Sequence, residues 1–185
     1  MLQRSGYPIT VLPARREGLS LYDYCVDREM IPSPRARWCT QWWKVVPIRA
    51  YQEAPAFDLM GIDAGEPRRA KYRERDGIVA DYPLVRWGVN RAGCLEVIKR
   101  HGLPIPKKSG CFFCPYQRRE QWVDLRENYP DLWCKATRLE QIVVEKQRKK
   151  GNAPYYLGSH PLPDIVQENQ GSLFDGYRRP CQCGL

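Results

Sequence analysis

The sequence predicts an α/β domain followed by a helical segment and an extended tail. Residues 57–62 (FDLMGI) form a short, mostly apolar run that ends in a glycine-containing turn, the pattern of a buried parallel strand. Residues 132–143 predict the clearest helix, because apolar residues recur there at spacings of four, three and four. Beyond Gly151 there is little periodicity, so we expect an extended tail that is ordered only where it docks.

The N-terminal region predicts few regular elements. In the first 36 residues, prolines break the apolar stretches, which indicates loops around one strand and one short helix. Helical spacing begins at Arg37, but Pro47 lacks the backbone N–H that a helix interior needs. Pro47 should therefore kink or end that helix near Trp43.

Further along the chain, strand and helix signals alternate. Residues 82–84 look like the end of a strand, and Asn90 is a suitable cap for a helix that stops at Gly102. A proline-rich loop carrying Cys-Phe-Phe-Cys comes next, followed by a helix over residues 117–128. We expect three regions: an α/β region with a cysteine metal site (1–115), a helical segment (116–150) and the tail (151–185).

The charge of the chain favours polyanionic partners. It has 30 Lys and Arg residues against 21 Asp and Glu residues, a formal net charge of +9. Such a balance suits nucleic acid, nucleotides, sulfate or phosphate, with a generic basic surface as the alternative reading. No apolar run is long enough to span a bilayer, and the first six residues lack the features of a secretory signal. We expect a soluble, cytoplasmic protein with no membrane partner.

Cysteines carry the most specific chemistry in this sequence. The chain has 8 of them, more than a cytoplasmic protein of 185 residues needs for disulfides, so metal binding or thiol chemistry is expected. Cys111 and Cys114 form the sharpest pattern, since two thiolates at this spacing on a turn can reach one metal ion or cluster. A redox dithiol shares the spacing but normally starts a helix in a thioredoxin-like unit. Incidental thiols are the third reading.

Further ligands must come from isolated cysteines, because there is no second Cys-x-x-Cys pair. Cys39 is the best third ligand, since a helix start and Arg37 would both favour its thiolate. A packing thiol between tryptophans is the alternative. Cys94 and Cys134 fall within predicted helices, where we expect core positions. Cys25 gives no indication of a role.

Two other groups are candidates for the site. Cys181 and Cys183, on the tail, could supply a fourth ligand, act as a nucleophile or stay in solvent. Arg68 and Arg69 follow the predicted strand, where open α/β sheets bind ligands, and guanidinium groups suit phosphate or sulfate. A solvated charged loop is the competing reading.

Several stretches, taken in order, resemble one family over residues 32–115. They are 37–48 (RWCTQWWKVVPI), 61–70 (GIDAGEPRRA), 82–87 (YPLVRW) and 101–115 (HGLPIPKKSGCFFCP). Together they resemble the phosphoadenosine phosphosulfate (PAPS) reductase family of the PP-loop, or adenine nucleotide alpha-hydrolase-like, superfamily. The resemblance implies a partial PP-loop parallel sheet. It also implies a [4Fe-4S] cluster held by Cys39, Cys111 and Cys114, with zinc as the alternative metal.

The resemblance leaves the fourth ligand to a tail cysteine such as Cys181, to another thiol or to an exchangeable sulfur. The terminal residues 182–185 (QCGL) are similar to the Glu-Cys-Gly-Leu-His end of these reductases, whose cysteine attacks the sulfonyl group. This implies Cys183 as the catalytic thiol, and Arg69 as a residue that binds the nucleotide. The family's Ser-Gly-Gly-x-Asp-Ser loop is absent, and Asp63 stands where reductases commonly have Arg.

The expected function follows from this resemblance. It implies an iron–sulfur protein that takes part in sulfur transfer or sulfonucleotide reduction, as an oxidoreductase or sulfur transferase with an anionic substrate. One alternative is a non-catalytic, metal-stabilised module that binds nucleic acid. Another is a partner subunit that completes a split PP-loop enzyme, with the nucleotide-binding loop on a separate chain.

Overall fold

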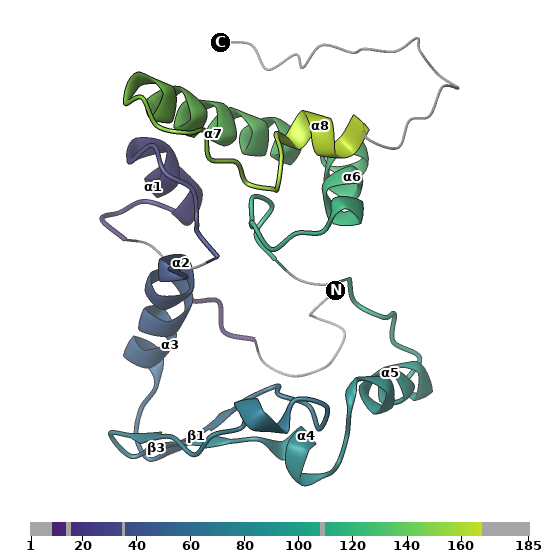
Figure 1. The fold of residues 1–185 in the computed structure, drawn as a ribbon. Helices are drawn as coiled ribbons and strands as arrows, with labels where there is room; N and C mark the ends of the chain where they lie inside the picture. The colour runs from purple at the N-terminus through teal and green to yellow at the C-terminus, as the bar shows by residue number, and fades with distance from the viewer. Residues whose placement is uncertain (1–8, 14–15, 35, 108–109, 168–185) are drawn as a thin grey trace. The chain divides into compact units, whose positions relative to one another are not determined.

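The computed structural model describes residues 9–13, 16–34, 36–107 and 110–167. Contacts divide the chain into two compact units, residues 1–47 with 110–185 and residues 48–109. The described residues combine helices with one small mixed sheet, which agrees with the predicted α/β class (Figure 1).

The helices of the first unit enclose its apolar core. Helix α7 (Pro130–Lys149) lies beside α1 (Leu21–Asp27), α6 (Arg119–Asn128) and α8 (Leu162–Gln167) (Figure 1). The predicted stripe along residues 132–143 is confirmed, because Ala136, Leu139 and Val143 are buried. The predicted helix over residues 117–128 is also present, and it begins at Arg119. Trp122, Leu157 and Leu162 complete the centre of this core.

A buried carboxylate attaches α8 to α7. Glu140 is 4% exposed, and its two oxygens accept hydrogen bonds from the backbone N–H groups of Leu157 and Leu162, each at 2.9 Å. Burial raises the pKa of Glu140, and the two hydrogen bonds oppose that shift. The segment predicted as an extended tail therefore contains a docked helix, with Ile165 and Val166 buried.

Pro47 distorts its helix without ending it. Helix α2 (Trp38–Thr40) leads into a π-helical turn, η2 (Gln41–Val45), and then into α3 (Val46–Tyr51). The predicted distortion near Trp43 is thus present as a π turn, whereas the helix continues past Pro47. A regular α-helix would bring the proline ring against the carbonyl of Trp43, four residues earlier, and the π turn changes the hydrogen bonding at that point.

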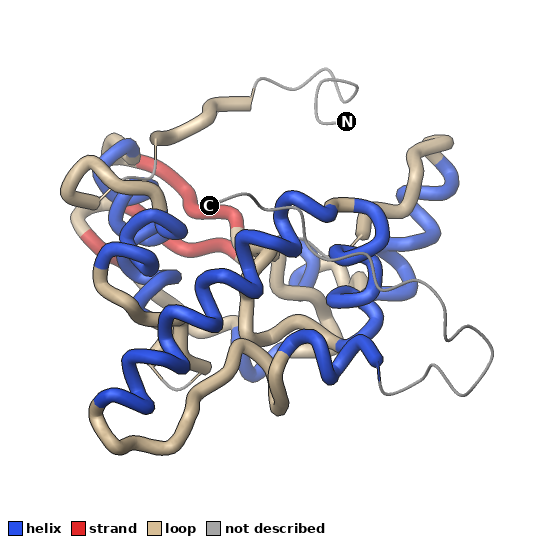
Figure 2. Tube along the Cα trace, turned by 90° about the horizontal axis from the view of Figure 1, so that it is seen from above, coloured by secondary structure: helices blue, strands red, loops and turns tan. Residues whose placement is uncertain are grey.

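The second unit contains the sheet, which Figure 2 shows in red. Its strand order is β1-β3-β2, with β1 (Ala56–Leu59) parallel to β3 (Ile78–Asp81) and β2 (Glu74–Arg75) antiparallel to β3. The parallel strand predicted within residues 57–62 is confirmed as β1, but its predicted burial is wrong. Phe57 is 73% exposed and Leu59 is 66% exposed, because side chains alternate along a strand and these two share its exposed face.

Two helices follow the sheet. The strand ends at Asp81, and Pro83 opens α4 (Pro83–Arg86), so the predicted strand end at residues 82–84 is wrong. Proline suits the first turn of a helix, where its missing N–H would have no intrahelical partner. The predicted cap is confirmed, since the Asn90 side chain accepts a hydrogen bond of 3.0 Å from the N–H of Gly93 at the start of α5 (Arg91–Arg100). Gly102, at φ +64°, follows the end of α5 as predicted.

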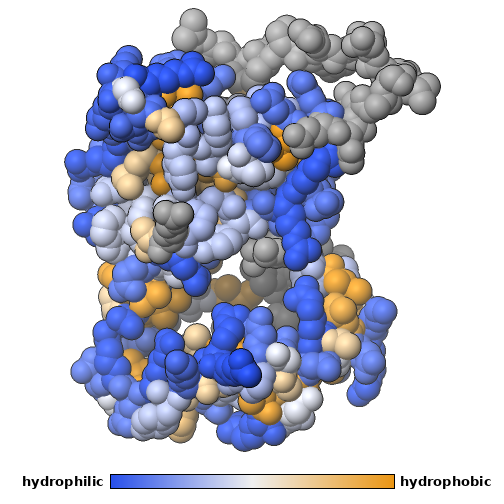
Figure 3. Space-filling view, viewed as in Figure 1, coloured by the Kyte–Doolittle hydropathy of each residue, from blue (hydrophilic) through white to orange (hydrophobic). Residues whose placement is uncertain are grey.

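The visible surface carries mostly hydrophilic side chains, with separate hydrophobic patches among them (Figure 3).

A short 3-10 helix, η3 (Pro67–Arg69), lies between β1 and β2 in the chain. Among the described helices, none has the length and apolar character that crossing a membrane requires.

Candidate metal centre

Four cysteines of the first unit come from three segments of the chain. Cys25 lies on α1, Cys39 lies on α2, and Cys111 and Cys114 lie on the loop before α6. All four are free thiols. Cys25 is fully buried and the other three are half-buried.

Aromatic side chains next to these cysteines bring the three segments into contact. The Tyr22 ring lies 5.5 Å from Phe112 and 5.8 Å from Phe113, the two residues between Cys111 and Cys114. The Tyr24 ring lies 6.2 Å from Trp38, the residue before Cys39. Tyr22 and Tyr24 lie three residues and one residue before Cys25 on α1, so α1 contacts both of the segments that carry the predicted ligands.

The loop with the cysteine pair is fixed by hydrogen bonds. The N–H of Cys114 donates to the carbonyl of Cys111 at 3.1 Å, which closes the turn. Nε2 of Gln117 donates to the carbonyls of Cys111 and Phe112, at 3.1 and 2.8 Å. Phe113 is 2% exposed and anchors the turn in the core. The predicted placement of this pair on a loop, just before a helix, is confirmed.

A second contact ties this loop to the segment before Cys39. The hydroxyl of Tyr116 donates a hydrogen bond of 2.9 Å to the carbonyl of Pro34. Arg37 then adopts a left-handed conformation, at φ +45°, and caps the start of α2. Cys39 is the second residue of that helix, which agrees with its predicted place at a helix start.

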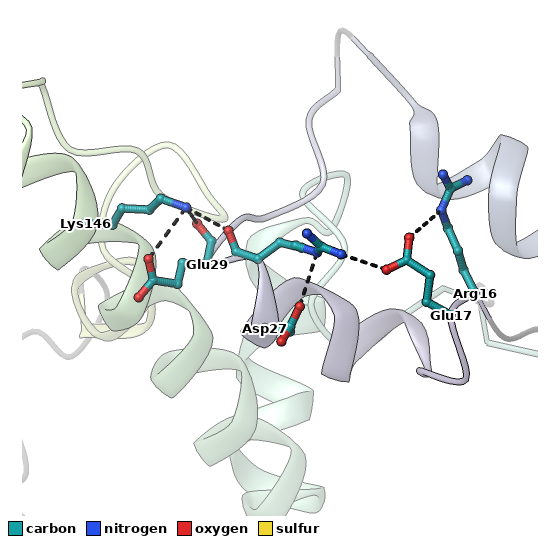
Figure 4. Close-up of polar contacts among 6 residues, drawn as sticks. Arg16, Glu17, Asp27, Glu29 and Lys146 are labelled. Carbon is teal, nitrogen blue, oxygen red and sulfur yellow. Dashed lines mark hydrogen bonds and ion pairs between the residues drawn. The ribbon is translucent and has the colours of Figure 1, made fainter.

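Lys146 holds the end of α1 against α7. Its ammonium group donates to the carbonyls of Arg28 and Glu29, at 2.7 and 3.3 Å, and pairs with the Glu29 carboxylate at 3.6 Å. These contacts satisfy carbonyls that a helix end would otherwise leave unpaired. Figure 4 shows that the polar network continues along the outside of α1 to Glu17. A further hydrogen bond joins α1 to α7, since the Tyr22 hydroxyl donates to the carbonyl of Lys135 at 3.2 Å.

The electrostatic environment of the thiols reflects their mutual proximity. Burial, together with the charges of Cys39 and Cys111, raises the pKa of Cys25 to about 12. Burial also raises the pKa of Cys111, while Lys44 lowers it and Cys114 and Cys39 raise it. Without metal, Cys25 and Cys111 therefore keep their protons at neutral pH. A bound metal would displace those protons, because cysteine ligands bind as thiolates.

The described thiols have the chemistry of metal ligands. Among the residues that the structure describes, no three His, Cys, Asp or Glu side chains are close enough together to hold one metal ion. In a [4Fe-4S] cluster, each cysteine binds a different iron, and thiolates are the preferred ligands. Four free thiols from three segments therefore fit a cluster in number and in chemistry.

The other candidate residues lie elsewhere. Arg69 ends η3 in the second unit, where it is exposed and paired with the carboxylate of Glu66. Cys94 on α5 and Cys134 on α7 are half-buried, although we expected core positions for both. Cys181 and Cys183 lie outside the described residues.

Sequence reasoning missed the position of Cys25. It stands 14 residues before Cys39, one short proline-rich loop upstream of a predicted ligand, and that proximity is the signal that could have found it. No family model matches this sequence, and no curated protein and no solved structure matches it either. The functional conclusion therefore depends on the chemistry of these cysteines.

Proposed function

We propose that this chain is an iron–sulfur protein, similar to the PAPS reductase family, that takes part in sulfur transfer or sulfonucleotide reduction. The observation that supports it best is the meeting of segments distant in sequence at the free thiols Cys39, Cys111 and Cys114. Thiolate-only donor sets are typical of iron–sulfur clusters. When bound, the cluster would supply positive charge and redox capacity beside an anionic sulfur group.

The surrounding charge supports an anionic substrate. Lys44 is exposed, and its charge acts on Cys111. The chain as a whole carries a formal charge of +9. A sulfonucleotide brings several negative charges, which such a surface attracts over distances of about 8–10 Å at physiological salt.

The chain's own catalytic group would be Cys183. Its thiolate would attack the sulfur of the sulfonyl group, forming a sulfur–sulfur bond while the bond to the nucleotide's phosphate oxygen breaks and the phosphate leaves with the electron pair. An external dithiol would then attack the Cys183 sulfur, release sulfite and become a disulfide. Cys183 would return as a thiol, ready for another turnover.

The test is anaerobic purification followed by iron, zinc and sulfide analysis and an absorbance spectrum. We expect a brown protein with about four irons and equivalent sulfide per chain. Cys111→Ala and Cys114→Ala should lose that iron. The matched control is Cys94→Ala, which removes a free, half-buried thiol on α5 and should keep it. A colourless protein with one zinc per chain would contradict the proposal.

Catalysis requires a separate test. Cys183→Ala should keep the iron and lose the release of sulfite from PAPS or adenylylsulfate in the presence of a dithiol. If the wild-type chain binds the cluster but releases no sulfite, the cluster has a structural role, as in a nucleic-acid-binding module. The basic charge then predicts salt-sensitive binding to RNA or DNA.

One observation favours a second candidate, a subunit of a split PP-loop enzyme. Among the described residues, β1 is an edge strand of a three-stranded sheet, and it exposes Phe57 and Leu59. A chain that supplies the nucleotide loop could extend the sheet at this edge and cover both side chains. This candidate predicts that the isolated chain does not bind ATP. Tight ATP binding by the isolated chain, measured by equilibrium dialysis, would rule it out.

A further inference from the structure

We infer that Cys25 is the fourth cysteine ligand of the cluster, so that every iron is bound by the protein and none is open to substrate. The inference rests on the proposed function, because it presupposes that Cys39, Cys111 and Cys114 hold a cluster. It also decides a point that the sequence leaves open, where Cys181, another thiol or an exchangeable sulfur could each fill the fourth position.

The placement of Cys25 carries the inference. Tyr24, the residue directly before Cys25, contacts Trp38, which precedes Cys39. Tyr22, three residues before Cys25 on the same helix, contacts Phe112 and Phe113, which separate the loop cysteines. Through residues one and three positions before Cys25, α1 therefore contacts both segments that carry the other three ligands.

Burial distinguishes Cys25 from the other three thiols. It is 0% exposed, whereas Cys39, Cys111 and Cys114 are each half-buried. Of the four, Cys25 lies deepest in the core. A cluster held by three half-exposed thiols and one buried thiol would be bound at the edge of the core, with its inner iron shielded from water. That iron is the one that an outside ligand could reach least easily.

An unpaired donor beside the cysteines gives independent support. Nε1 of Trp43 is buried, and it has no hydrogen-bond partner among the described residues. The ring of Trp43 lies 5.0 Å from Tyr24 and 6.0 Å from Trp38, the residues that precede Cys25 and Cys39. A buried donor without an acceptor costs about 1–3 kcal/mol. Cluster sulfurs accept hydrogen bonds from protein N–H groups, so a cluster here would supply the missing acceptor.

The competing interpretation is a packing thiol. Buried free cysteines often serve as small apolar side chains, and Cys25 belongs to the same core cluster as Phe113 and Trp122. A packing thiol predicts that alanine at this position changes stability but not iron. If Cys25 is a ligand, alanine should lower the iron content more than the stability, because alanine fills most of the same volume but cannot bind iron.

The experiment compares wild-type protein, Cys25→Ala and Cys94→Ala, each purified without oxygen. Iron and sulfide are measured per chain, and Mössbauer spectra show whether any iron differs from the rest in its ligands. EPR spectra of the reduced proteins are then recorded with and without added cyanide, which binds an iron only where a coordination position is open. Circular dichroism and urea unfolding of the iron-free proteins show whether Cys25→Ala folds.

We expect the wild type and Cys94→Ala to hold about four irons and to give EPR spectra that cyanide does not change. Cys25→Ala should lose iron, either completely or down to a three-iron cluster, or give a spectrum that cyanide shifts. An unchanged iron content and spectrum in a folded Cys25→Ala would overturn the inference. So would a wild-type spectrum that cyanide shifts, and this result holds even if the variant does not fold.

Measurements on the wild-type protein distinguish a failure of the inference from a failure of the proposed function. If wild-type protein holds no iron and sulfide, the proposed function fails and the inference fails with it. If wild-type protein holds a cluster that cyanide alters, only the role of Cys25 fails. With Cys25 as a ligand, the substrate's sulfur cannot bind iron directly, and any sulfur chemistry must proceed at a separate thiol.

Discussion

Glu140 offers the sharpest test of how this fold is held together. In Glu140→Ala, the backbone N–H groups of Leu157 and Leu162 lose the carboxylate oxygens that accept their hydrogen bonds, each of 2.9 Å. A buried donor left unsatisfied costs about 1–3 kcal/mol, which gives about 2–6 kcal/mol for both. Thr137, Val144 and Tyr156 line a cavity of about 230 Å³ beside Glu140 that is partly open to solvent. Water can therefore hydrate the freed groups, and we expect about 2–3 kcal/mol.

The matched control is Glu145→Ala, which removes the same charge from an exposed position on the same helix. Surface changes of this kind usually stay within about 0.5 kcal/mol. Urea unfolding followed by circular dichroism gives both free energies of unfolding. If Glu140→Ala and Glu145→Ala agree within that margin, the two hydrogen bonds do not anchor α8, and the reasoning is refuted.

The same residue predicts the pH dependence of stability. Because burial raises the pKa of Glu140, the folded protein holds this proton more tightly than the unfolded chain does. The contribution of Glu140 to stability should therefore fall as pH rises from the usual glutamate pKa towards the raised value. Glu140→Ala should lose this slope and Glu145→Ala should keep it. A slope shared by all three proteins would assign the effect to another group.

Three further substitutions test other parts of the structure, each by urea unfolding. Leu139→Ala should cost about 2–5 kcal/mol, because Leu139 is 0% exposed at the centre of the core; a loss below 1 kcal/mol would contradict that burial. Asn90→Ala should cost about 1 kcal/mol through the loss of the α5 cap, and Asn90→Asp should restore most of it. Lys146→Ala should cost about 1–2 kcal/mol, because two carbonyls at the end of α1 lose a charged donor, whereas Lys149→Ala should change little; equal losses would show that Lys146 does not hold α1.

Local signals in the sequence predicted their elements well. The stripe of apolar residues in α7 extends over several turns, and the Asn90 cap needs only a donor three residues away. The pair Cys111 and Cys114 was expected on a loop for the same reason, since the prolines and lysines before it disfavour a helix. In each case the residues that decide the structure are neighbours in the chain.

Features that depend on contacts between residues far apart in the sequence were not predicted. The sequence of β1 predicts a buried strand, but which face of a strand is covered depends on what packs against it. Cys25 showed no pattern because α1 is only 7 residues long and its position is set by Lys135 and Lys146, more than 100 residues later. Pro47 predicted a distortion but not its form, since an end, a kink and a π turn all relieve the same clash.

The contact between Lys146 and α1 has a consequence for the order in which the protein matures. A helix of 7 residues is too short to persist alone in water, and the carbonyls that end α1 are paired by a side chain that the ribosome adds 117 and 118 residues later. During synthesis, Cys25 and Cys39 therefore emerge long before α1 has the partner that fixes it. A metal centre that includes Cys25 would therefore be assembled only after α7 has been synthesised.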